Sequence, residues 1–254
     1  MSLREGRCVG AEALIRWQHT ARGLVAPHEF ITLAEETGII VPLGSWVLEE
    51  ACREAARWCR DHRGPEGFVI SVNLSARQLA QPDLPDQVAR ALGLAGADPR
   101  FLCLEITESA LMDDVDTTIG AIQELKALGV RLSVDDFGTG YSSLGYLKRF
   151  PVDSVKVDRS FVDGLGTDPE DSAIVAAVVS LGRALGLTVV AEGVETEEQL
   201  SELMELGCDQ AQGFFFAPPQ PGIDMAALVA RAPRWRLPEG AGRSFLSRSR
   251  RHAG

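Results

Sequence analysis

The chain has 254 residues, of which 45% are hydrophobic and 24% are charged, and its formal net charge is −11. This length suits one domain with a substantial core, and an α/β barrel commonly reaches it. A strongly acidic chain repels nucleic-acid backbones, so DNA binding is not expected, and no apolar run is long enough to span a membrane. A phosphate ligand would therefore need bound cations.

Targeting and cysteine usage both indicate a cytoplasmic protein. The N-terminus lacks a basic-then-apolar leader, and residues 1–8 read as a short leader or a truncated start of the domain. The five cysteines form no CxxC pair. Reduced core thiols are therefore favoured over disulfides or a zinc site.

Apolar periodicity and helix-end signals predict alternating strands and helices along the chain. In chain order we expect a strand at 9–14, helices at 27–36 and 43–61, a strand at 68–73, a helix at 83–92, a strand at 101–106, a helix at 115–128, a strand at 130–134, a helix at 142–148, a strand at 154–157, a helix at 169–185, a strand at 187–191, a helix at 197–206, a strand at 211–215 and a helix at 224–231. A Gly-containing loop is expected between the first strand and the first helix. Thr196 and Gln199 fit a capping box.

This alternation predicts an α/β fold with a parallel sheet, either a barrel or a doubly wound sheet. A dinucleotide-binding fold loses support because no GxGxxG follows the first strand. The seven predicted strands are one short of an eight-stranded barrel. We place the barrel at residues 9–232 and a basic, flexible tail at 233–254.

The stretch LSVDDFGTGYSSL carries the first chemical signal. An apolar run delivers two adjacent carboxylates, Asp135 and Asp136, followed at once by a Gly-rich turn. Adjacent acids repel each other unless a cation lies between them, and hard divalent ions prefer carboxylate oxygens. The stretch therefore predicts a metal site.

Every predicted strand ends in an acid, an amide or a lysine. These residues are Glu12, Asn73, Glu105, Asp135, Lys156, Glu192 and Gln212. For any one of them a capping or loop role is an ordinary explanation. In a barrel of parallel strands, however, all C-terminal ends lie on one face, where active sites are built. Taken together, the residues predict one active site.

The donors are oxygen ligands with no soft ligand among them, which selects Mg²⁺ or Mn²⁺ over zinc or copper. Their number suits two ions that share Asp135, a pair that activates water for displacement at phosphorus. Lys156 lies in an apolar strand and could hold or deprotonate that water, or neutralise transition-state charge. Arg16 could bind a phosphate, although a solvated arginine explains it equally well.

These motifs resemble those of the EAL phosphodiesterase domain, named for the tripeptide that stands here as Glu12-Ala13-Leu14. The resemblance runs from about residue 9 to 230 through EALIRW, NLSARQL, EITES, DDFGTGYSSL, VKVDRSFV, AEGVE and AQGFFF. It implies a TIM-like (β/α)8 barrel that hydrolyses cyclic di-GMP to linear pGpG with two Mg²⁺ or Mn²⁺ ions in each site.

The resemblance also implies roles for individual residues. The implied metal ligands are Glu12, Asn73, Glu105, Asp135, Asp136 and Glu192. The implied catalytic residues are Lys156, which organises the attacking water, Glu12, the supporting Gln212, and Glu195, a carboxylate behind the ligands. Glu108 anchors the DDFGTG loop, and Leu14 and Arg16 contact the substrate. Because that loop couples dimerisation to activity in the family, a homodimer is expected.

One departure from the family concerns the start of the domain. The family opens with an additional strand that carries a Tyr-Gln-Pro-like sequence and a substrate-contacting glutamine, whereas this chain begins just after it. An open sheet edge and weak activity are the expected consequences. Sensor or cyclase domains, the family's usual partner modules, are also expected to be absent from this chain.

Two other functions remain open. A non-catalytic cyclic di-GMP receptor is the main alternative, but such relatives usually lose metal ligands or the lysine, and none is lost here. A metal-dependent barrel lyase that acts on a carboxylate is weaker, because the tandem aspartates and their Gly-rich loop do not suit it. Incubation with cyclic di-GMP and with carboxylic acids separates the three.

Overall fold

A computed structural model describes residues 1–60, 68–112, 115–140, 147–231 and 235. The chain forms two compact units. Unit 1 comprises Met1–Val9, Val134–Lys148 and Val152–Gly254, and unit 2 comprises Gly10–Ser133 and Arg149–Pro151. Among the described residues, no helix is long and apolar enough to cross a membrane.

The main sheet has seven strands within the described residues, in the order β1-β4-β5-β6-β7-β8-β9. They are β1 (Gly10–Ala13), β4 (Val69–Leu74), β5 (Leu102–Thr107), β6 (Arg131–Phe137), β7 (Ser154–Val157), β8 (Thr188–Ala191) and β9 (Gln210–Ala211). The pairs β1–β4, β4–β5, β7–β8 and β8–β9 are parallel. The predicted α/β class and the positions of the first six predicted strands are therefore confirmed.

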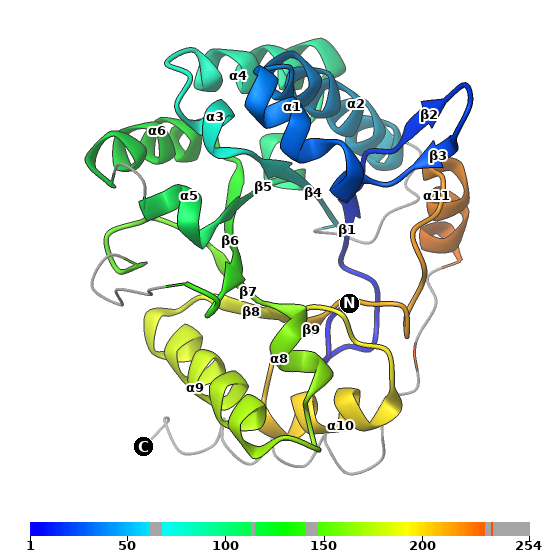
Figure 1. Cartoon of the computed structure of the whole chain (residues 1–254), viewed down its shortest axis with the longest axis vertical. Helices are drawn as coiled ribbons and strands as arrows, with labels where there is room; N and C mark the ends of the chain where they lie inside the picture. The colour runs from blue at the N-terminus through cyan, green and yellow to red at the C-terminus, as the bar shows by residue number, and fades with distance from the viewer. Residues whose placement is uncertain (61–67, 113–114, 141–146, 232–234, 236–254) are drawn as a thin grey trace. The chain divides into compact units, whose positions relative to one another are not determined.

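Unit 2 contains helices packed on strands β4 and β5 (Figure 1). Its helical elements are η1 (Pro27–Glu29), α1 (Ile31–Thr37), α2 (Ile40–Arg60), α3 (Ala76–Leu79), α4 (Leu84–Ala95), η2 (Pro99–Phe101), α5 (Glu108–Met112) and α6 (Val115–Ala127). The long α2 lies against α4 and β4, and its apolar face buries Leu48, Cys52 and Ala55. These side chains recur at helical spacing, which is why the sequence pattern located the helix.

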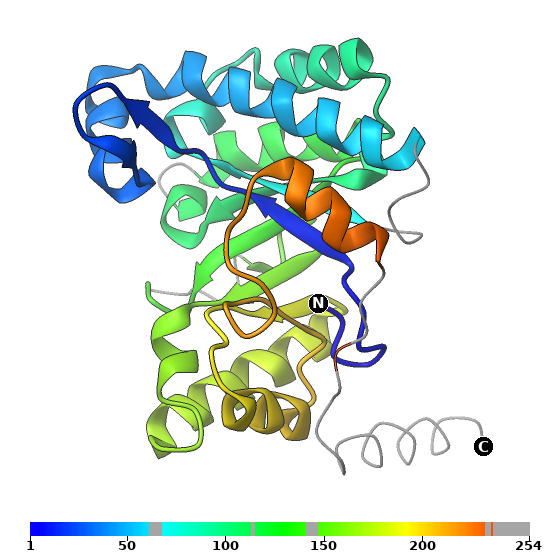
Figure 2. The same cartoon turned by 90° about the vertical axis from the view of Figure 1, so that its right-hand side faces the viewer.

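The expected loop after β1 is instead a hairpin of β2 (Trp17–His19) and β3 (Gly23–Val25), which can be followed in Figure 2. Its turn ends at Gly23, which has φ of +72°, a conformation that glycine adopts without steric cost. The Trp17 ring contacts Phe30 edge to face. Each strand is only three residues long, too short for an alternating apolar pattern to be recognised.

Unit 1 contains α8 (Arg159–Asp163), α9 (Pro169–Leu185), α10 (Glu197–Leu206) and α11 (Gly222–Ala230). Helix α9 packs on β7 and β8 and contacts α10 (Figure 1). The predicted capping box at Thr196 and Gln199 is confirmed, and α9 has the predicted bounds. The helix expected at 142–148 lies mostly outside the described residues.

The strand predicted at 211–215 ends early, because β9 contains only Gln210–Ala211. After it the backbone turns toward the loop that follows β8: the Val194 amide donates to the Gln212 carbonyl at 3.0 Å, and the Phe215 amide donates to the Val194 carbonyl at 3.0 Å. The predicted strand is too long because Phe214 and Phe215 extend the apolar pattern of the sequence, whereas strand β9 ends at Ala211.

An open sheet edge is expected from the sequence, whereas the first residues of the chain cover the edge at β9. Ser2 forms an antiparallel bridge to Gln210. The Leu3 amide donates to the Asp209 carbonyl, and the Ala211 amide donates to the Met1 carbonyl, both at 3.0 Å. Residues 1–3 thus occupy hydrogen-bonding groups that an edge strand would otherwise expose.

The cysteines support the interpretation as reduced core thiols. Cys8, Cys52, Cys103 and Cys208 are buried and form no disulfide. Burial raises the pKa of Cys52 to about 11 and that of Cys208 to about 12. Both side chains therefore stay protonated and behave as small apolar groups.

A candidate metal and catalytic site

Three carboxylates in unit 1 form a cluster suited to a divalent cation. Asp135 and Asp136 lie near the end of β6, and Glu192 directly follows β8. One ligand oxygen from each lies within 4.8 Å of the others. Among the described residues this is the group whose spacing suits a metal ion, and it contains three of the predicted ligands.

Lys156 lies inside this cluster. Its Nζ atom is 3.1 Å from Asp135 Oδ1 and 2.5 Å from Glu192 Oε1. The side chain is only 2% exposed, so the ammonium group depends on these carboxylates in place of water. This burial agrees with the sequence, in which valines on both sides of Lys156 argue against a surface lysine.

Asp136 lies close to other negative charges. Burial, followed by the neighbouring Asp135 and then Asp158, raises the pKa of Asp136, while Lys156 acts in the opposite direction. Its backbone has φ of +53°, the one non-glycine positive value recorded among the described residues. Backbone strain and like charges at a shared site are both features of functional positions. A bound divalent cation would relieve this repulsion, so the donor set fits a hard metal ion.

Gln212 supports the cluster from the segment after β9. Its Nε2 atom donates to Glu192 Oε1 at 2.7 Å, so one carboxylate oxygen is bonded by both Gln212 and Lys156. The backbone N–H of Gln212 also donates to the Ala191 carbonyl at 2.8 Å. The side chain predicted as a supporting group therefore orients Glu192.

Gly213 lies where the segment after β9 packs against the loop after β8, and this position requires a glycine. A Cβ atom there would lie 2.2 Å from the Val194 carbonyl oxygen and 2.3 Å from the Val194 nitrogen. Gly213 also has φ of +154°. Only a residue without a Cβ atom allows the two backbones to approach this closely.

Gly213→Ala is therefore expected to destabilise the protein by about 3 to 5 kcal/mol, from overpacking together with strain. Gly166→Ala is the matched control, because Gly166 also has positive φ but nothing within 4 Å of its added Cβ; it should cost only about 1 to 2 kcal/mol. Thermal unfolding measures both. Equal losses would mean that the contact with Val194 relaxes without cost.

Unit 2 holds the other predicted ligands on one face of its strands. Glu12 lies opposite Ser71 in the β1–β4 register, and Asn73 lies opposite Glu105 in the β4–β5 register. Because alternate residues of a strand share a face, Glu12, Asn73 and Glu105 point to the same side of this sheet. The Asn73 amide donates to Glu12 Oε1 at 2.7 Å.

The remaining predicted residues differ in burial. Glu105 and Glu108 are both 4% exposed, an unusual position for carboxylates that suits a ligand and a loop anchor. Leu14 and Arg16 are exposed just after β1, and Arg16 donates to the Ile15 carbonyl at 2.8 Å. Their exposure is compatible with substrate contact. The structure places both residues in unit 2, together with Glu12.

Asp158 and Arg159 are site residues that the sequence reasoning did not single out. Asp158 caps α8 by accepting a hydrogen bond from the Ser160 amide, and its charge acts on Asp136. Arg159 forms an ion pair with Glu195 at 2.8 Å. The signal was available, because both residues directly follow the strand that carries Lys156.

Comparisons with known proteins agree on the family. A sequence model described as the EAL domain matches residues 1–219. The chain is 49% identical over 225 residues to a "Bifunctional diguanylate cyclase/cyclic di-GMP phosphodiesterase MucR" of Pseudomonas aeruginosa, covering 89% of this chain and 33% of that protein. It is 45% identical over 228 residues to "Cyclic di-GMP phosphodiesterase NbdA" of the same species, covering 90% and 28%. The chain thus spans about a third of the length of these relatives.

Solved structures give the same result. The structure titled "PaMucR Phosphodiesterase, c-di-GMP complex" matches with a TM-score of 0.82 and 49% identity, covering 85% of this chain and 87% of that one. The EAL domain of Mycobacterium smegmatis DcpA matches with a TM-score of 0.75 and 38% identity, covering 93% and 94%. Such domains are TIM-like barrels, the fold class that the resemblance implied. Motifs, fold and similarity lead to one conclusion: the chain belongs to the EAL domain family.

Proposed function

We propose that this chain hydrolyses cyclic di-GMP to linear pGpG in a reaction that depends on Mg²⁺ or Mn²⁺. The observation that carries the proposal is the buried Lys156 ammonium group, paired with Asp135 and Glu192 inside a carboxylate cluster that suits a metal. The similarity to relatives named as cyclic di-GMP phosphodiesterases supports the choice of substrate.

The proposed reaction opens one of the two phosphodiester bonds of the ring. A water oxygen forms a bond to phosphorus, and the bond from phosphorus to the ribose 3′ oxygen breaks. One proton of the water leaves the attacking oxygen, and the departing 3′ oxygen takes up a proton. The product is linear pGpG, and no oxidant or second substrate is needed.

We assign metal binding to Asp135, Asp136 and Glu192, together with Glu12, Asn73 and Glu105 as predicted from the strand ends. A bound pair of Mg²⁺ or Mn²⁺ ions would lower the pKa of a water molecule. The ions would also supply positive charge that stabilises the phosphate in the transition state. The cation preference follows from the donors, which are carboxylate and amide oxygens.

Lys156 is assigned to the attacking water. An ammonium group between two carboxylates can hold a water molecule in line with phosphorus and can neutralise charge that develops on the phosphate. Its burial strengthens both effects, because a low local dielectric increases electrostatic interactions. Gln212 keeps Glu192 oriented through its amide hydrogen bond.

Several finer assignments belong to the same proposal. Leu14 and Arg16 contact the substrate, Glu108 anchors the DDFGTG loop, and residues 9–232 form the phosphodiesterase domain. The homodimer through the DDFGTG region stays a prediction, and residues 141–146 of that region lie outside the described part of the chain.

The decisive assay measures pGpG formation from cyclic di-GMP by chromatography, with Mg²⁺, with Mn²⁺ and with a chelator. We expect turnover with either metal, its loss on chelation because the carboxylates then lack their ion, and recovery when metal is added back. A panel of carboxylic acids incubated in parallel should stay unchanged.

Each alternative function predicts a different result in this assay. Tight binding of cyclic di-GMP without turnover would assign the chain to the receptor class. Turnover of a carboxylic acid would assign it to the lyases. Turnover that persists after complete chelation would refute the metal-dependent mechanism while leaving the substrate assignment intact.

A further inference from the structure

The loop between β8 and α10 carries two carboxylates with different surroundings. Glu192 begins the loop and is bonded to Lys156 and Gln212. Glu195 lies three residues later, just before the Thr196 cap of α10, and is exposed. The position of Glu192 therefore depends on what holds the rest of this short loop.

Arg159 contacts the loop at two places. Its side-chain stem lies against Gly193, where an added Cβ atom would be only 2.3 Å from Arg159 Cγ. Gly193 has φ of +72°, so the loop turns sharply beneath the arginine. Beyond this contact the guanidinium group reaches Glu195, with Arg159 Nη2 2.8 Å from Glu195 Oε1.

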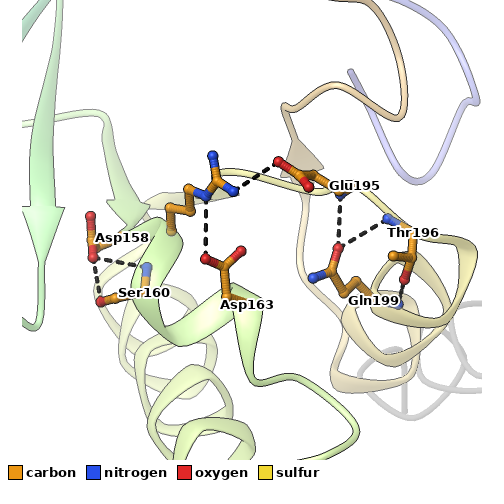
Figure 3. A network of polar contacts seen from close by, with 7 residues as sticks. Asp158, Ser160, Asp163, Glu195, Thr196 and Gln199 are labelled. Carbon is orange, nitrogen blue, oxygen red and sulfur yellow. Dashed lines mark hydrogen bonds and ion pairs between the residues drawn. The ribbon is translucent and has the colours of Figure 1, made fainter.

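Both ends of this ion pair are fixed to helices. Arg159 is the first residue of α8, and its Nε atom donates to Asp163 Oδ2 at 3.3 Å. The Glu195 amide donates to Gln199 Oε1 at 2.8 Å, beside the capping box of α10. Figure 3 shows the carboxylates of Asp163 and Glu195 and the Gln199 side chain in this network.

Lys156 and Arg159 are three residues apart on one strand-to-helix connection. Lys156 bonds the first carboxylate of the loop, and Arg159 bonds the second. Because Gly193 and Val194 are all that separates Glu192 from Glu195, a displacement of Glu195 is transmitted to Glu192 over a short stretch of backbone. Both cations thus hold the same loop.

We propose that Arg159 is a positioning residue of this site: its contacts with Gly193 and Glu195 hold the β8–α10 loop so that Glu192 stays in place to bind the metal. This inference rests on the proposed function and extends it. It also gives Glu195 a specific role, as the loop's attachment point for Arg159.

The exposure of the ion pair separates this role from a general effect on stability. The Arg159 and Glu195 side chains are 52% and 41% exposed, and exposed ion pairs contribute little to overall stability because water and salt screen them. Removing the pair should therefore change metal affinity while leaving the melting temperature nearly unchanged. A residue with a merely structural role would do the reverse.

The test compares Arg159→Gln with Asp163→Asn in the full chain. Asp163→Asn is the matched control, because it removes the charge of the other ion-pair partner of Arg159, which lies in α8 and not in the loop. Mn²⁺ affinity is measured by isothermal titration without substrate, and unfolding is followed by heating. We expect Arg159→Gln to weaken Mn²⁺ binding about three- to ten-fold, Arg159→Lys to recover part of the loss, and Asp163→Asn to bind within about two-fold of wild type.

A double-variant comparison sharpens the test. If Arg159 acts through Glu195, Glu195→Gln should weaken Mn²⁺ binding to a similar extent, and the double variant should be no worse than either single variant. Independent losses that add in the double variant would overturn the proposal. An affinity of Arg159→Gln equal to wild type, or equal losses in Asp163→Asn, would overturn it as well.

Failure of the inference and failure of the proposed function give different results. If wild type binds Mn²⁺ and hydrolyses cyclic di-GMP but Arg159→Gln binds Mn²⁺ equally well, only the role of Arg159 is refuted. If wild type binds no Mn²⁺, the metal-dependent function and the role of Arg159 are both refuted.

Discussion

Lys156→Ala is expected to lower the rate of cyclic di-GMP hydrolysis about 100- to 10,000-fold while leaving Mn²⁺ binding intact. The ammonium group is only 2% exposed and bonds Asp135 and Glu192, so its removal takes away the positive charge assigned to the attacking water. It also removes a cation that competes for the same two carboxylates. Mn²⁺ affinity should therefore be equal to that of wild type or higher.

The measurement pairs single-turnover hydrolysis with Mn²⁺ titration. Lys148→Ala is the matched control, because it deletes an exposed lysine of the same unit and should leave both values unchanged. Loss of Mn²⁺ binding in Lys156→Ala would show that the lysine organises the metal site and not the water. Hydrolysis near the wild-type rate would remove Lys156 from the mechanism.

Glu12→Ala is expected to lower hydrolysis about 1,000-fold or more, because a lost metal ligand costs several kcal/mol of transition-state stabilisation and each 1.4 kcal/mol is a factor of ten. The change also leaves the Asn73 amide without the acceptor it contacts at 2.7 Å. Two predicted ligands are therefore disturbed by one substitution. Hydrolysis is measured at saturating Mn²⁺ and again over a Mn²⁺ titration.

Glu36→Ala in α1 is the comparison for this variant, since it removes an exposed glutamate of the same unit and should hydrolyse cyclic di-GMP like wild type. If Glu12→Ala also hydrolyses cyclic di-GMP at the wild-type rate, Glu12 is not a metal ligand. The proposal would then have to assign the metal without this residue of unit 2. If excess Mn²⁺ restores the rate fully, Glu12 contributes to affinity alone.

The first residues of the chain bear on the position of Gln212. The N-terminal residues cover the edge of β9 through the Leu3 and Ala211 amides, and β9 leads directly to Gln212. The first three residues therefore support the segment that orients Glu192.

Local sequence signals located most of the secondary structure. Helix α9 begins at Pro169 and ends before Gly186, and α10 begins at a capping box, as predicted. Such signals act within a few residues, so they can be read directly from the chain. They failed where local pattern and tertiary hydrogen bonding diverge, as at Phe215, whose amide bonds the loop after β8.

The sequence by itself determined the α/β class and six of the seven strand positions. It also predicted the chemistry of the site, because polar residues at the ends of apolar strands are a one-dimensional pattern. Only the tertiary structure decided how those residues pair. The bond of Lys156 to Glu192 and the attachment of Arg159 to Glu195 each join β7 or α8 to a loop more than thirty residues later. Such pairings depend on strand register and on backbone turns at Gly193 and Gly213, which no local periodicity encodes.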